Sequence, residues 1–323
     1  MDSILVSVII PVKNGAYWLN NTLTKILTQQ VNGPIEIIII DSGSTDETVE
    51  IVKKFPVKYI CIPSEEFNHG ETRNLGVRAA KGKYVVMTVQ DAVPADDLWL
   101  AKLLEGFDDD NVAGVCGQQV VPHNEKMNPV QWFRPVNKPT KVKYHFADAN
   151  KYNALSPAQK KTVCGWDNVN AMYRKDVLIK IPFRKILFGE DMLWAKDVLI
   201  DGYSIVYNMA AQVEHYHNET PDFIFKRTLS EVYFRYKNFG IIPVMQKFEF
   251  RKQLTNIRLL FKAKISNAER WKWFKYTISQ QSNSKKAINA FQLALNKGES
   301  YLDSFYKKTC NIAPTPNTKI NNE

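Results

Sequence analysis

Short apolar runs alternate with segments of helical periodicity along the first 90 residues of the chain. The runs are continuous and rich in β-branched residues, which is typical of strands that a parallel sheet buries on both faces. They occupy residues 7–12, 35–41, 57–62 and 83–89. Helices are predicted between them, one with Leu19, Leu23, Ile26 and Leu27 on one face and one over residues 71–81. This order predicts a doubly wound, mostly parallel α/β sheet, whose ligands bind beyond the carboxyl ends of its strands.

The alternation continues less regularly toward residue 207. We expect helices over residues 96–107 and 190–201, and strands over residues 112–121, 168–173 and 203–207. The segment 122–162 is polar, contains prolines and is weakly periodic, which is typical of a long functional loop or lid.

The last quarter of the chain differs from the rest in its charge. Residues 241–323 hold 15 basic and 5 acidic residues, whereas residues 1–240 hold 28 of each, so the net charge of +10 comes from the C-terminal part. That part implies an anionic partner. We predict an α/β domain over residues 1–240, a basic helical extension over 241–310 and a disordered tail over 311–323.

The extension also has an apolar stripe and aromatic residues that lie among its basic residues. Apolar residues recur at helical spacing in a stripe that consists of Phe250, Leu254, Ile257, Phe261 and Ile265. Basic residues accompany Trp271 and Trp273, and this combination is typical of a helix that binds an anionic membrane surface. The stripe itself has two interpretations, because it can face lipid or pack against the α/β domain.

Cysteines and the N-terminus bear on location. The four cysteines are scattered and form no C-x-x-C pair, which fits a reducing cytosol better than a disulfide framework. The start, MDSILVSVIIPV, lacks a basic leader region, and no stretch reaches the roughly 20 apolar residues that a membrane span needs. We expect the protein to stay on the cytosolic side.

Polar residues follow the predicted strands where a doubly wound sheet binds its ligands. Asn14 follows the first strand, Asp41 ends the second and Asp91 follows the fourth. A carboxylate there can accept a hydrogen bond from a nucleobase or a ribose hydroxyl, and it can also hold a divalent cation that bridges a diphosphate. Each residue alone is more often a turn or cap residue, so the pattern matters more than any single position.

Five segments resemble family-2 glycosyltransferases of the GT-A fold in their order and spacing. They are SVIIPVKN, IIIIDSGSTDET, HGETRNLGVRAAKGKYVVMTVQDAVP, GEDMLWAKDVL and VEHYH. The combination F-N-H-G-x-T-R-N with Q-D-A-x-P and E-D-x-L-W-A is most similar to bacterial rhamnosyltransferases that build surface polysaccharides. The resemblance covers about residues 5–240 and implies that residues 1–240 are a glycosyltransferase catalytic domain. Its donor is then a dTDP- or UDP-sugar.

The resemblance also implies which residues hold the donor. Pro11, Asn14, Asp41 and Ser44 match the nucleotide pocket of the family, and Arg73 matches an arginine that faces the diphosphate.

The metal motif departs from the family pattern. Asp91 corresponds to the second acid of D-x-D, but the first position is Val89, so the sequence is V-Q-D. We expect Gln90 to substitute for the missing ribose contact. By the resemblance, His215 is a late ligand of the metal or of the diphosphate. The metal is Mn²⁺ or Mg²⁺ and also uses diphosphate oxygens and water. His217 lies on the same strand face as His215 but matches no ligand of the family.

The expected reaction is an inverting transfer to a hydroxyl of a growing glycan or a lipid-linked acceptor. The leaving diphosphate needs positive charge, and the attacking hydroxyl must lose a proton to a carboxylate. The resemblance implies that Asp191 is this base, with the adjacent Glu190 as the second candidate. Trp166 can stack on a sugar or simply pack in the core.

Two other functions remain open. One is a UDP-hexose or UDP-N-acetylhexosamine transferase of the same fold. The other, of a different class, is a membrane- or nucleic-acid-binding protein that uses the basic segment. The segment lacks any RNA- or DNA-binding module signature, so we expect no nucleic acid as partner. We expect a cytoplasmic protein, peripheral on the cytosolic face of the inner membrane through residues 241–310.

Overall fold

The computed structural model describes residues 3–123, 126–245 and 250–310 of the 323-residue chain. By their internal contacts these residues form two compact units. The first unit comprises Met1–Val120 and Val136–His215, and the second comprises Val121–Pro135 and Tyr216–Glu323. The division expected at residue 240 remains a prediction, and the expected disordered tail at 311–323 lies outside the described residues.

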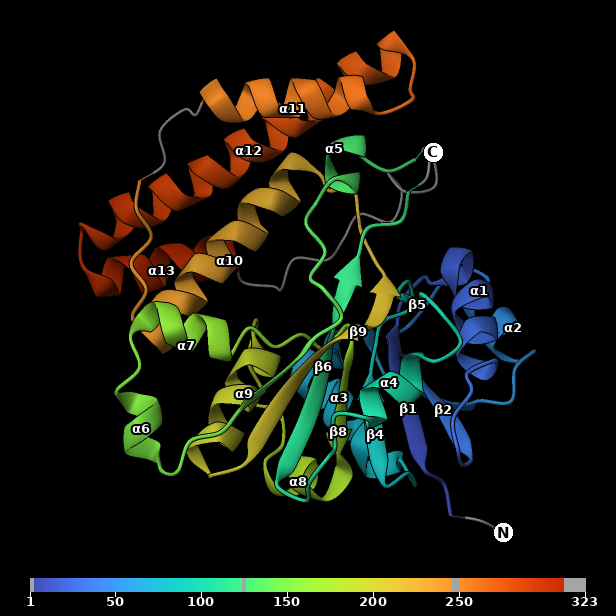
Figure 1. The fold of residues 1–323 in the computed structure, drawn as a ribbon. Coiled ribbons are helices and arrows are strands. Elements are labelled where there is room, and N and C mark those ends of the chain that lie inside the picture. The colour runs from blue at the N-terminus through green and yellow to red at the C-terminus, as the bar shows by residue number, and fades with distance from the viewer. Residues whose placement is uncertain (1–2, 124–125, 246–249, 311–323) are drawn as a thin grey trace. The chain divides into compact units, whose positions relative to one another are not determined.

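The first unit is built on one sheet that has nine strands within the described residues (Figure 1). The strands are Val6–Val12 (β1), Ile35–Asp41 (β2), Lys58–Cys61 (β3), Tyr84–Met87 (β4), Val93–Pro94 (β5), Val112–Val120 (β6), Lys141–Tyr144 (β7), Ala171–Arg174 (β8) and Ser204–Glu214 (β9). Their order is β3-β2-β1-β4-β8-β6-β9-β5, with β7 paired to β9. The pairs among β1 to β4 and the pair β6–β9 are parallel, whereas β8 runs antiparallel to both β4 and β6. The expected mostly parallel, doubly wound α/β sheet is thus confirmed.

Helices cover both faces of this sheet. They are Ala16–Leu27 (α1), Thr48–Val52 (α2), His69–Ala79 (α3), Trp99–Leu104 (α4), Ala149–Asn153 (α6), Pro157–Val163 (α7), Lys175–Lys180 (α8) and Glu190–Ile200 (α9), with a 3-10 turn at Ser64–Glu66. Apolar side chains of α1, α2 and α4 join those of β1 and β2 in one buried cluster on one face. On the other face α3 approaches so closely that a Cβ at Gly76 would lie 2.5 Å from Ile9 Cγ2. The sheet is therefore a buried middle layer.

Two expected features differ from the structure. Leu27 of α1 is 37% exposed, because the helix buries Thr22 in the core with Leu19, Leu23 and Ile26. The segment 122–162 is not a plain loop, since it contains α6, α7, β7 and the short helix Pro129–Trp132 (α5). Pro-started turns and side-chain caps nucleate these short helices without a long apolar repeat, for example the capping box between Ser156 and Gln159.

The second unit consists of helices within the described residues. With α5 they are Pro221–Phe239 (α10), Phe250–Lys262 (α11), Asn267–Leu295 (α12) and Glu299–Thr309 (α13). Leu229 of α10 shares a buried cluster with Phe291 of α12 and Leu302 of α13. None of the helices in the described part of the chain combines the length and the apolar character that a membrane crossing demands.

Helix α11 has an inverted arrangement of apolar and polar side chains. Its buried residues include Gln253 and Asn256, which hydrogen-bond to each other, and Gln253 also donates to Gln281 of α12. Phe250 and Phe261 of the predicted stripe are 66% and 68% exposed. Within their unit Phe250, Leu254 and Phe261 therefore face outward, because amide pairs hold the polar side of the helix inward. Ile265 instead packs against the buried cluster of Leu260 and Trp273.

Candidate active site

The loops after β1 and β2 form one hydrogen-bonded group. Asn14 has a φ of 50°, a left-handed conformation that Asn tolerates better than most side chains. Its amide N–H donates to Ser44 Oγ (2.8 Å), and its side-chain Oδ1 accepts from the N–H of Thr45 (2.8 Å). The Ser44 hydroxyl in turn donates to the carboxylate of Asp41. Three of the residues predicted to bind the nucleotide thus lie together at the ends of β1 and β2.

Asp41 has a second donor that the sequence did not indicate. Tyr59 of β3 donates its hydroxyl to Asp41 Oδ2 at 2.9 Å. Burial and this hydrogen bond raise the pKa of the Tyr59 phenol, so it remains a donor at every physiological pH. Asp41 is 1% exposed, and the hydroxyls of Ser44 and Tyr59 hold its carboxylate in place.

Gln90 connects the loop after β1 to the segment after β4. Its Oε1 accepts from the N–H of Lys13 (2.9 Å), and its Nε2 donates to the carbonyl of Lys13 (3.2 Å). A Cβ on Gly15 would lie 2.8 Å from Gln90 Oε1, so this approach depends on the glycine. Gln90 therefore braces the backbone beside Pro11 and Asn14, and its predicted ribose contact remains a prediction.

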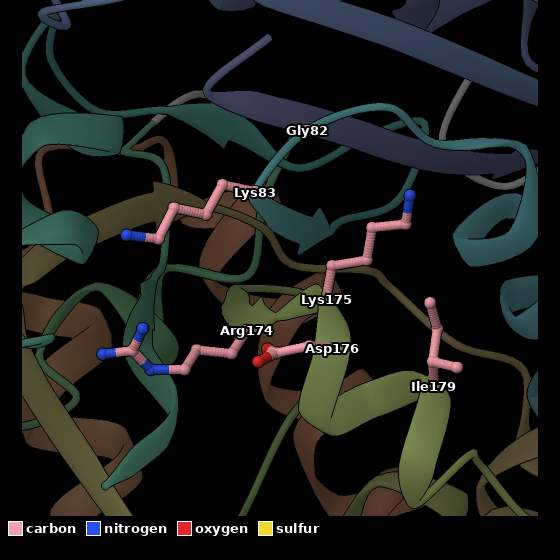
Figure 2. Close-up of a pocket in the computed structure, with 6 residues that line it drawn as sticks. All are labelled: Gly82, Lys83, Arg174, Lys175, Asp176 and Ile179. Carbon is pink, nitrogen blue, oxygen red and sulfur yellow. The ribbon is translucent and has the colours of Figure 1, made fainter. Parts of the chain in front are cut away.

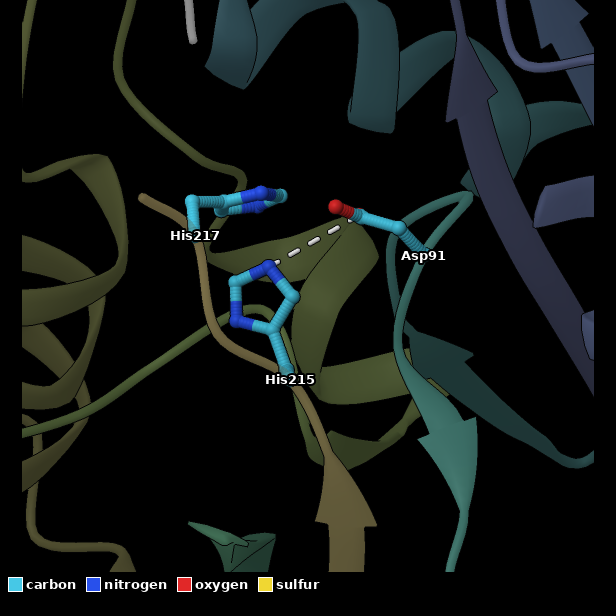
Figure 3. A group of neighbouring side chains, drawn as sticks. All are labelled: Asp91, His215 and His217. Atoms are coloured by element: carbon cyan, nitrogen blue, oxygen red, sulfur yellow. Dashed lines mark ion pairs between the residues drawn. The ribbon is translucent and has the colours of Figure 1, made fainter. Parts of the chain in front are cut away.

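Asp91 and His215 face each other across the carboxyl edge of the sheet (Figure 3). His215 Nε2 lies 3.6 Å from Asp91 Oδ1, and the two side chains are 15% and 9% exposed. His217 lies two residues further along the chain and belongs to the other compact unit, so the metal site that we propose below uses Asp91 and His215 alone.

Gln119 links His215 to Asp167. His215 Nδ1 lies 2.7 Å from Gln119 Oε1, and Gln119 Nε2 donates to the carboxylate of Asp167. Gln119 reaches this position next to an irregularity between β6 and β9, where the register shifts after Cys116. Gly117 permits that irregularity, because a Cβ there would lie 2.2 Å from the carbonyl oxygen of Ala211.

Arg73 and Glu190 form a buried ion pair. Arg73 NH1 lies 3.0 Å from Glu190 Oε1, and the two side chains are 5% and 7% exposed. Burial opposes ionisation of Glu190, but the charges of Arg73 and His69 outweigh it and lower the pKa of that carboxyl. Asn168 Nδ2 donates to the same oxygen at 3.2 Å. The structure thus places Arg73 against Glu190, and the predicted role of Arg73 toward the diphosphate remains a prediction.

Asp191 begins α9 next to this pair but has no cationic partner among the hydrogen bonds and ion pairs described. Its carboxylate accepts from the N–H of Asn168 (3.2 Å) and of Met192 (2.7 Å). Burial, together with the negative charges of Glu190 and Asp167, raises the pKa of Asp191 to about 8. The two adjacent acids therefore differ in chemistry: Glu190 is held as an anion, and Asp191 titrates near neutral pH.

These contacts run continuously along one edge of the sheet. They pass from Lys13 to Gln90, whose neighbour in the chain is Asp91. From Asp91 they pass to His215 and through Gln119 to Asp167, whose charge acts on Asp191. The predicted candidates occupy this edge. Asp167 and Gln119 were missed as linking residues: Asp167 precedes the strand predicted over 168–173, and Gln119 lies near the end of the strand predicted over 112–121. Trp166 is 3% exposed and packs on Trp194 and Tyr207, which supports its packing interpretation.

A surface pocket of about 350 Å³ lies at the other edge of the sheet, where β4 begins and β8 ends (Figure 2). It is lined by Gly82, Lys83, Arg174, Lys175, Asp176 and Ile179. Arg174 already donates to the carbonyls of Val112 and Asp109, and Lys175 donates to that of Ala80. Because these cations are engaged in the fold and the carboxyl ends of β1 and β2 lie elsewhere, we do not assign chemistry to this pocket.

Comparison with known proteins agrees with this arrangement. A family model described as "Glycosyl transferase family 2" matches residues 7–181. The O-antigen chain rhamnosyltransferase WbaN of Salmonella anatum is 35% identical over 225 residues, which are 68% of this chain and 69% of the relative. The O-antigen chain rhamnosyltransferase RfbN of Salmonella typhimurium is 34% identical over 229 residues, or 69% of each chain.

Solved structures share the fold at low sequence identity. TarS 1–349 of S. aureus superposes with a TM-score of 0.51 at 16% identity and covers 95% of this chain and 90% of its own. The mannosyltransferase PcManGT of Pyrobaculum calidifontis, solved in complex with GDP-Man and Mn²⁺, also gives 0.51 at 16%, with coverages of 95% and 79%. These likenesses support the expected GT-A fold. Together with the family model and the relatives, they show that this chain belongs to glycosyl transferase family 2 and is a glycosyltransferase.

Proposed function

We propose that the chain transfers a sugar, rhamnose, from a nucleotide-diphosphate donor to a hydroxyl of a growing glycan or lipid-linked acceptor in bacterial polysaccharide synthesis. Two relatives at 35% and 34% identity are O-antigen chain rhamnosyltransferases, which supports rhamnose as the sugar. The donor is a dTDP- or UDP-sugar, and the transfer inverts the anomeric carbon. The observation that carries the proposal is the different surroundings of two neighbouring acids: Arg73 pairs with Glu190 at 3.0 Å, whereas the Asp191 carboxylate accepts from the backbone N–H groups of Asn168 and Met192.

Asp191 is the general base in this proposal. Its carboxylate takes the proton of the acceptor hydroxyl while the oxygen forms a bond to the anomeric carbon. The bond from that carbon to the diphosphate oxygen breaks, and its electron pair leaves with the nucleotide. One displacement inverts the centre and needs no second nucleophile. A pKa near 8 suits the task, since a base is most effective when its pKa is close to the working pH.

Asp91 and His215 fit a divalent cation. A carboxylate oxygen and an imidazole nitrogen, two kinds of atom that can bind a metal, face each other at 3.6 Å. A carboxylate with an imidazole suits Mn²⁺, and Mg²⁺ can be held through the oxygen ligands. When bound there, the cation supplies positive charge for the departing diphosphate. Val89 leaves the motif with one acid, which His215 compensates as a protein ligand.

The group around Asp41 is our proposed nucleotide pocket. Pro11, Asn14, Asp41 and Ser44 line the ends of β1 and β2, and Gln90 fixes the loop between them. The Asp41 carboxylate is held by Ser44 and Tyr59, so it is preorganised to accept a hydrogen bond from the donor.

A panel of donors tests the sugar and the nucleobase of the donor together. The purified full chain is assayed for donor hydrolysis and for transfer with dTDP-rhamnose, UDP-rhamnose, UDP-glucose, UDP-galactose and UDP-N-acetylglucosamine, each with Mn²⁺, with Mg²⁺ and with chelator. Turnover of dTDP- or UDP-rhamnose alone is expected. Preferred turnover of a UDP-hexose or UDP-N-acetylhexosamine would replace rhamnose by the alternative donor of the same fold.

We also propose that the helical unit docks on the anionic surface of the cytosolic membrane face. Helix α11 exposes three apolar side chains, those of Phe250, Leu254 and Phe261. It belongs to the C-terminal part of the chain, from which the net positive charge comes. On α12, Trp271 is 58% exposed and stacks on Phe274. A groove of about 430 Å³ next to them also includes Lys275. Apolar area combined with basic residues matches the chemistry of an anionic lipid surface.

Point variants test docking better than a truncation at Gly240, because α10 shares its core with α12 and α13. The variant Phe250→Ser/Phe261→Ser/Trp271→Ser should lose flotation with vesicles that contain anionic lipid. The control Tyr17→Ser, which also changes an exposed aromatic residue (56%), should float like the wild type. Binding should weaken as salt rises, because the Debye length is about 8 Å at physiological ionic strength. Equal flotation of all three proteins, or none by the wild type at low salt, would refute docking.

A further inference from the structure

The side-chain amide of Gln119 can point in only one direction. Asp167 accepts hydrogen bonds but donates none when ionised, so the group of Gln119 that faces it must be the NH₂. The carbonyl oxygen Oε1 then faces His215 Nδ1 at 2.7 Å. Asp167 is fixed in turn, because its other oxygen accepts from the N–H of Val169 at 2.9 Å. The orientation of the amide thus follows from its neighbours and not from the amide itself.

This direction determines the tautomer of His215. An oxygen that can only accept requires a proton on Nδ1, and a neutral imidazole with Nδ1–H carries its lone pair on Nε2. Nε2 is the nitrogen that lies 3.6 Å from Asp91. The backbone N–H of His215 donates to the carbonyl of Val120 at 3.0 Å, which ties the histidine to the strand that carries Gln119.

We infer that Gln119, oriented by Asp167, is a positioning residue that fixes the tautomer of His215 and so makes its Nε2 a ligand for the cation. The inference rests on the metal site proposed above and deepens it. Without Gln119, Nε2 can carry the proton, and a protonated Nε2 cannot bind a metal. Histidines that bind metals are commonly oriented by a hydrogen bond at their other nitrogen. Here the orienting group is an amide held by a carboxylate.

The first experiment measures the tautomer without any metal. The full chain labelled with ¹⁵N at its five histidines is analysed by two-dimensional NMR, and the signals of His215 are those missing in His215→Gln. The wild type should show a protonated Nδ1 and a bare Nε2. Gln119→Leu should shift the ring toward protonated Nε2, whereas Gln119→Glu, which still offers an accepting oxygen, should keep the wild-type tautomer. A protonated Nε2 in the wild type, or an unchanged tautomer in Gln119→Leu, would overturn the inference.

The second experiment measures Mn²⁺ binding directly, by the electron paramagnetic resonance signal of free Mn²⁺. Gln119→Leu should raise the Kd for Mn²⁺ by about 10- to 100-fold. Gln119→Glu should stay much closer to the wild type. The matched control is Gln118→Leu. Gln118 is the preceding residue of the same strand, and its side-chain amide bonds to Met209 (2.9 Å) and Asn137 (3.1 Å) instead of His215. The control should bind Mn²⁺ like the wild type.

The outcomes separate the inference from the proposed metal site. If Asp91→Ala binds Mn²⁺ as tightly as the wild type, the metal site fails and the role of Gln119 fails with it. If Asp91→Ala loses Mn²⁺ but Gln119→Leu retains it, the metal site stands and Gln119 is refuted. In transfer assays, Gln119→Leu should need more Mn²⁺ for half-maximal rate but approach the wild-type kcat at saturation. A purely structural defect would lower kcat at every Mn²⁺ concentration.

Discussion

Replacing Asp191 by Asn should impair catalysis and yet stabilise the protein. The substitution keeps the shape of the side chain and removes the base, so transfer should fall by roughly 10²- to 10⁴-fold with donor affinity nearly unchanged. The effect on stability follows from the pKa of Asp191, which burial and two neighbouring negative charges raise from 3.8 to about 8. Between these two values the folded state binds more protons than the unfolded state, so the free energy of unfolding falls as pH rises from about 4 to about 8.

The size of the effect can be worked out. Each pKa unit corresponds to about 1.36 kcal/mol, so the shift costs about 5 kcal/mol at pH 8 and about 2 kcal/mol at pH 5. Asp191 is half-buried, and solvent access reduces these values to about half. Asn cannot accept from both N–H groups that the carboxylate serves, which costs about 1 kcal/mol. The variant should therefore gain about 2 kcal/mol at pH 8 and almost nothing at pH 5.

Calorimetry or thermal melting from pH 5 to pH 9 measures this difference. About 2 kcal/mol corresponds to a rise in Tm of about 4–8 °C for a unit of this size. The control is Asp197→Asn on the same helix. The Asp197 carboxylate pairs with Arg184 at 2.7 Å, and its replacement should change neither the pH dependence of Tm nor the turnover. A difference in Tm between Asp191→Asn and the wild type that does not grow with pH would refute the buried-acid argument. Near-wild-type turnover would transfer the role of base to Glu190.

Three further predictions concern the neighbouring charges. Activity should vanish with chelator and return with Mn²⁺ or Mg²⁺, and Asp91→Ala should abolish it; full activity in excess chelator would rule out the metal role. Arg73→Met should lower the free energy of unfolding by about 3–5 kcal/mol in urea melts, because it leaves the buried Glu190 carboxylate unpaired, and Arg73→Met/Glu190→Gln should recover much of that loss. Asp167→Asn removes a negative charge near Asp191, so the rise of kcat/KM with pH, expected near pH 8 in the wild type, should move to lower pH; an unchanged midpoint would contradict the assignment.

The fold was largely predictable because its strongest signals are local. Ile37, Ile38, Ile39 and Ile40 are 0–1% exposed, as a continuous apolar run in a parallel strand predicts. The segment 122–162 was not predictable in the same way, since its short helices depend on caps and on packing rather than on periodicity. The stripe of α11 shows the limit of periodicity: it gives the spacing of Phe250, Leu254 and Phe261 but not whether they face protein or solvent, which the pairing of Gln253 with Gln281 determines.

The candidate site divides along the same line. Residues that follow strands, such as Asn14, Asp41 and Asp91, could be found because the carboxyl edge of the sheet is implied by the strand order. Glu190 and Asp191 could be named but not told apart by local sequence, because their difference depends on Arg73, which lies 117 residues away in the chain. Gln119 gave no signal of its own, since an amide becomes informative only through the partners it meets.

The position of Asp91 and His215 along the chain has a consequence for how such enzymes diversify. Every residue proposed to hold the nucleotide lies before Asp91 on a continuous stretch of strands and helices, whereas the base and His215 come from later segments. A cation between Asp91 and His215 would then connect the segment that binds the nucleotide with the later segments that supply the base, and each of these could change in sequence without the other. Exchange of the first 91 residues with those of a relative that uses another nucleotide should change the donor and leave the acceptor chemistry intact, provided that the carboxylate that holds the cation is kept.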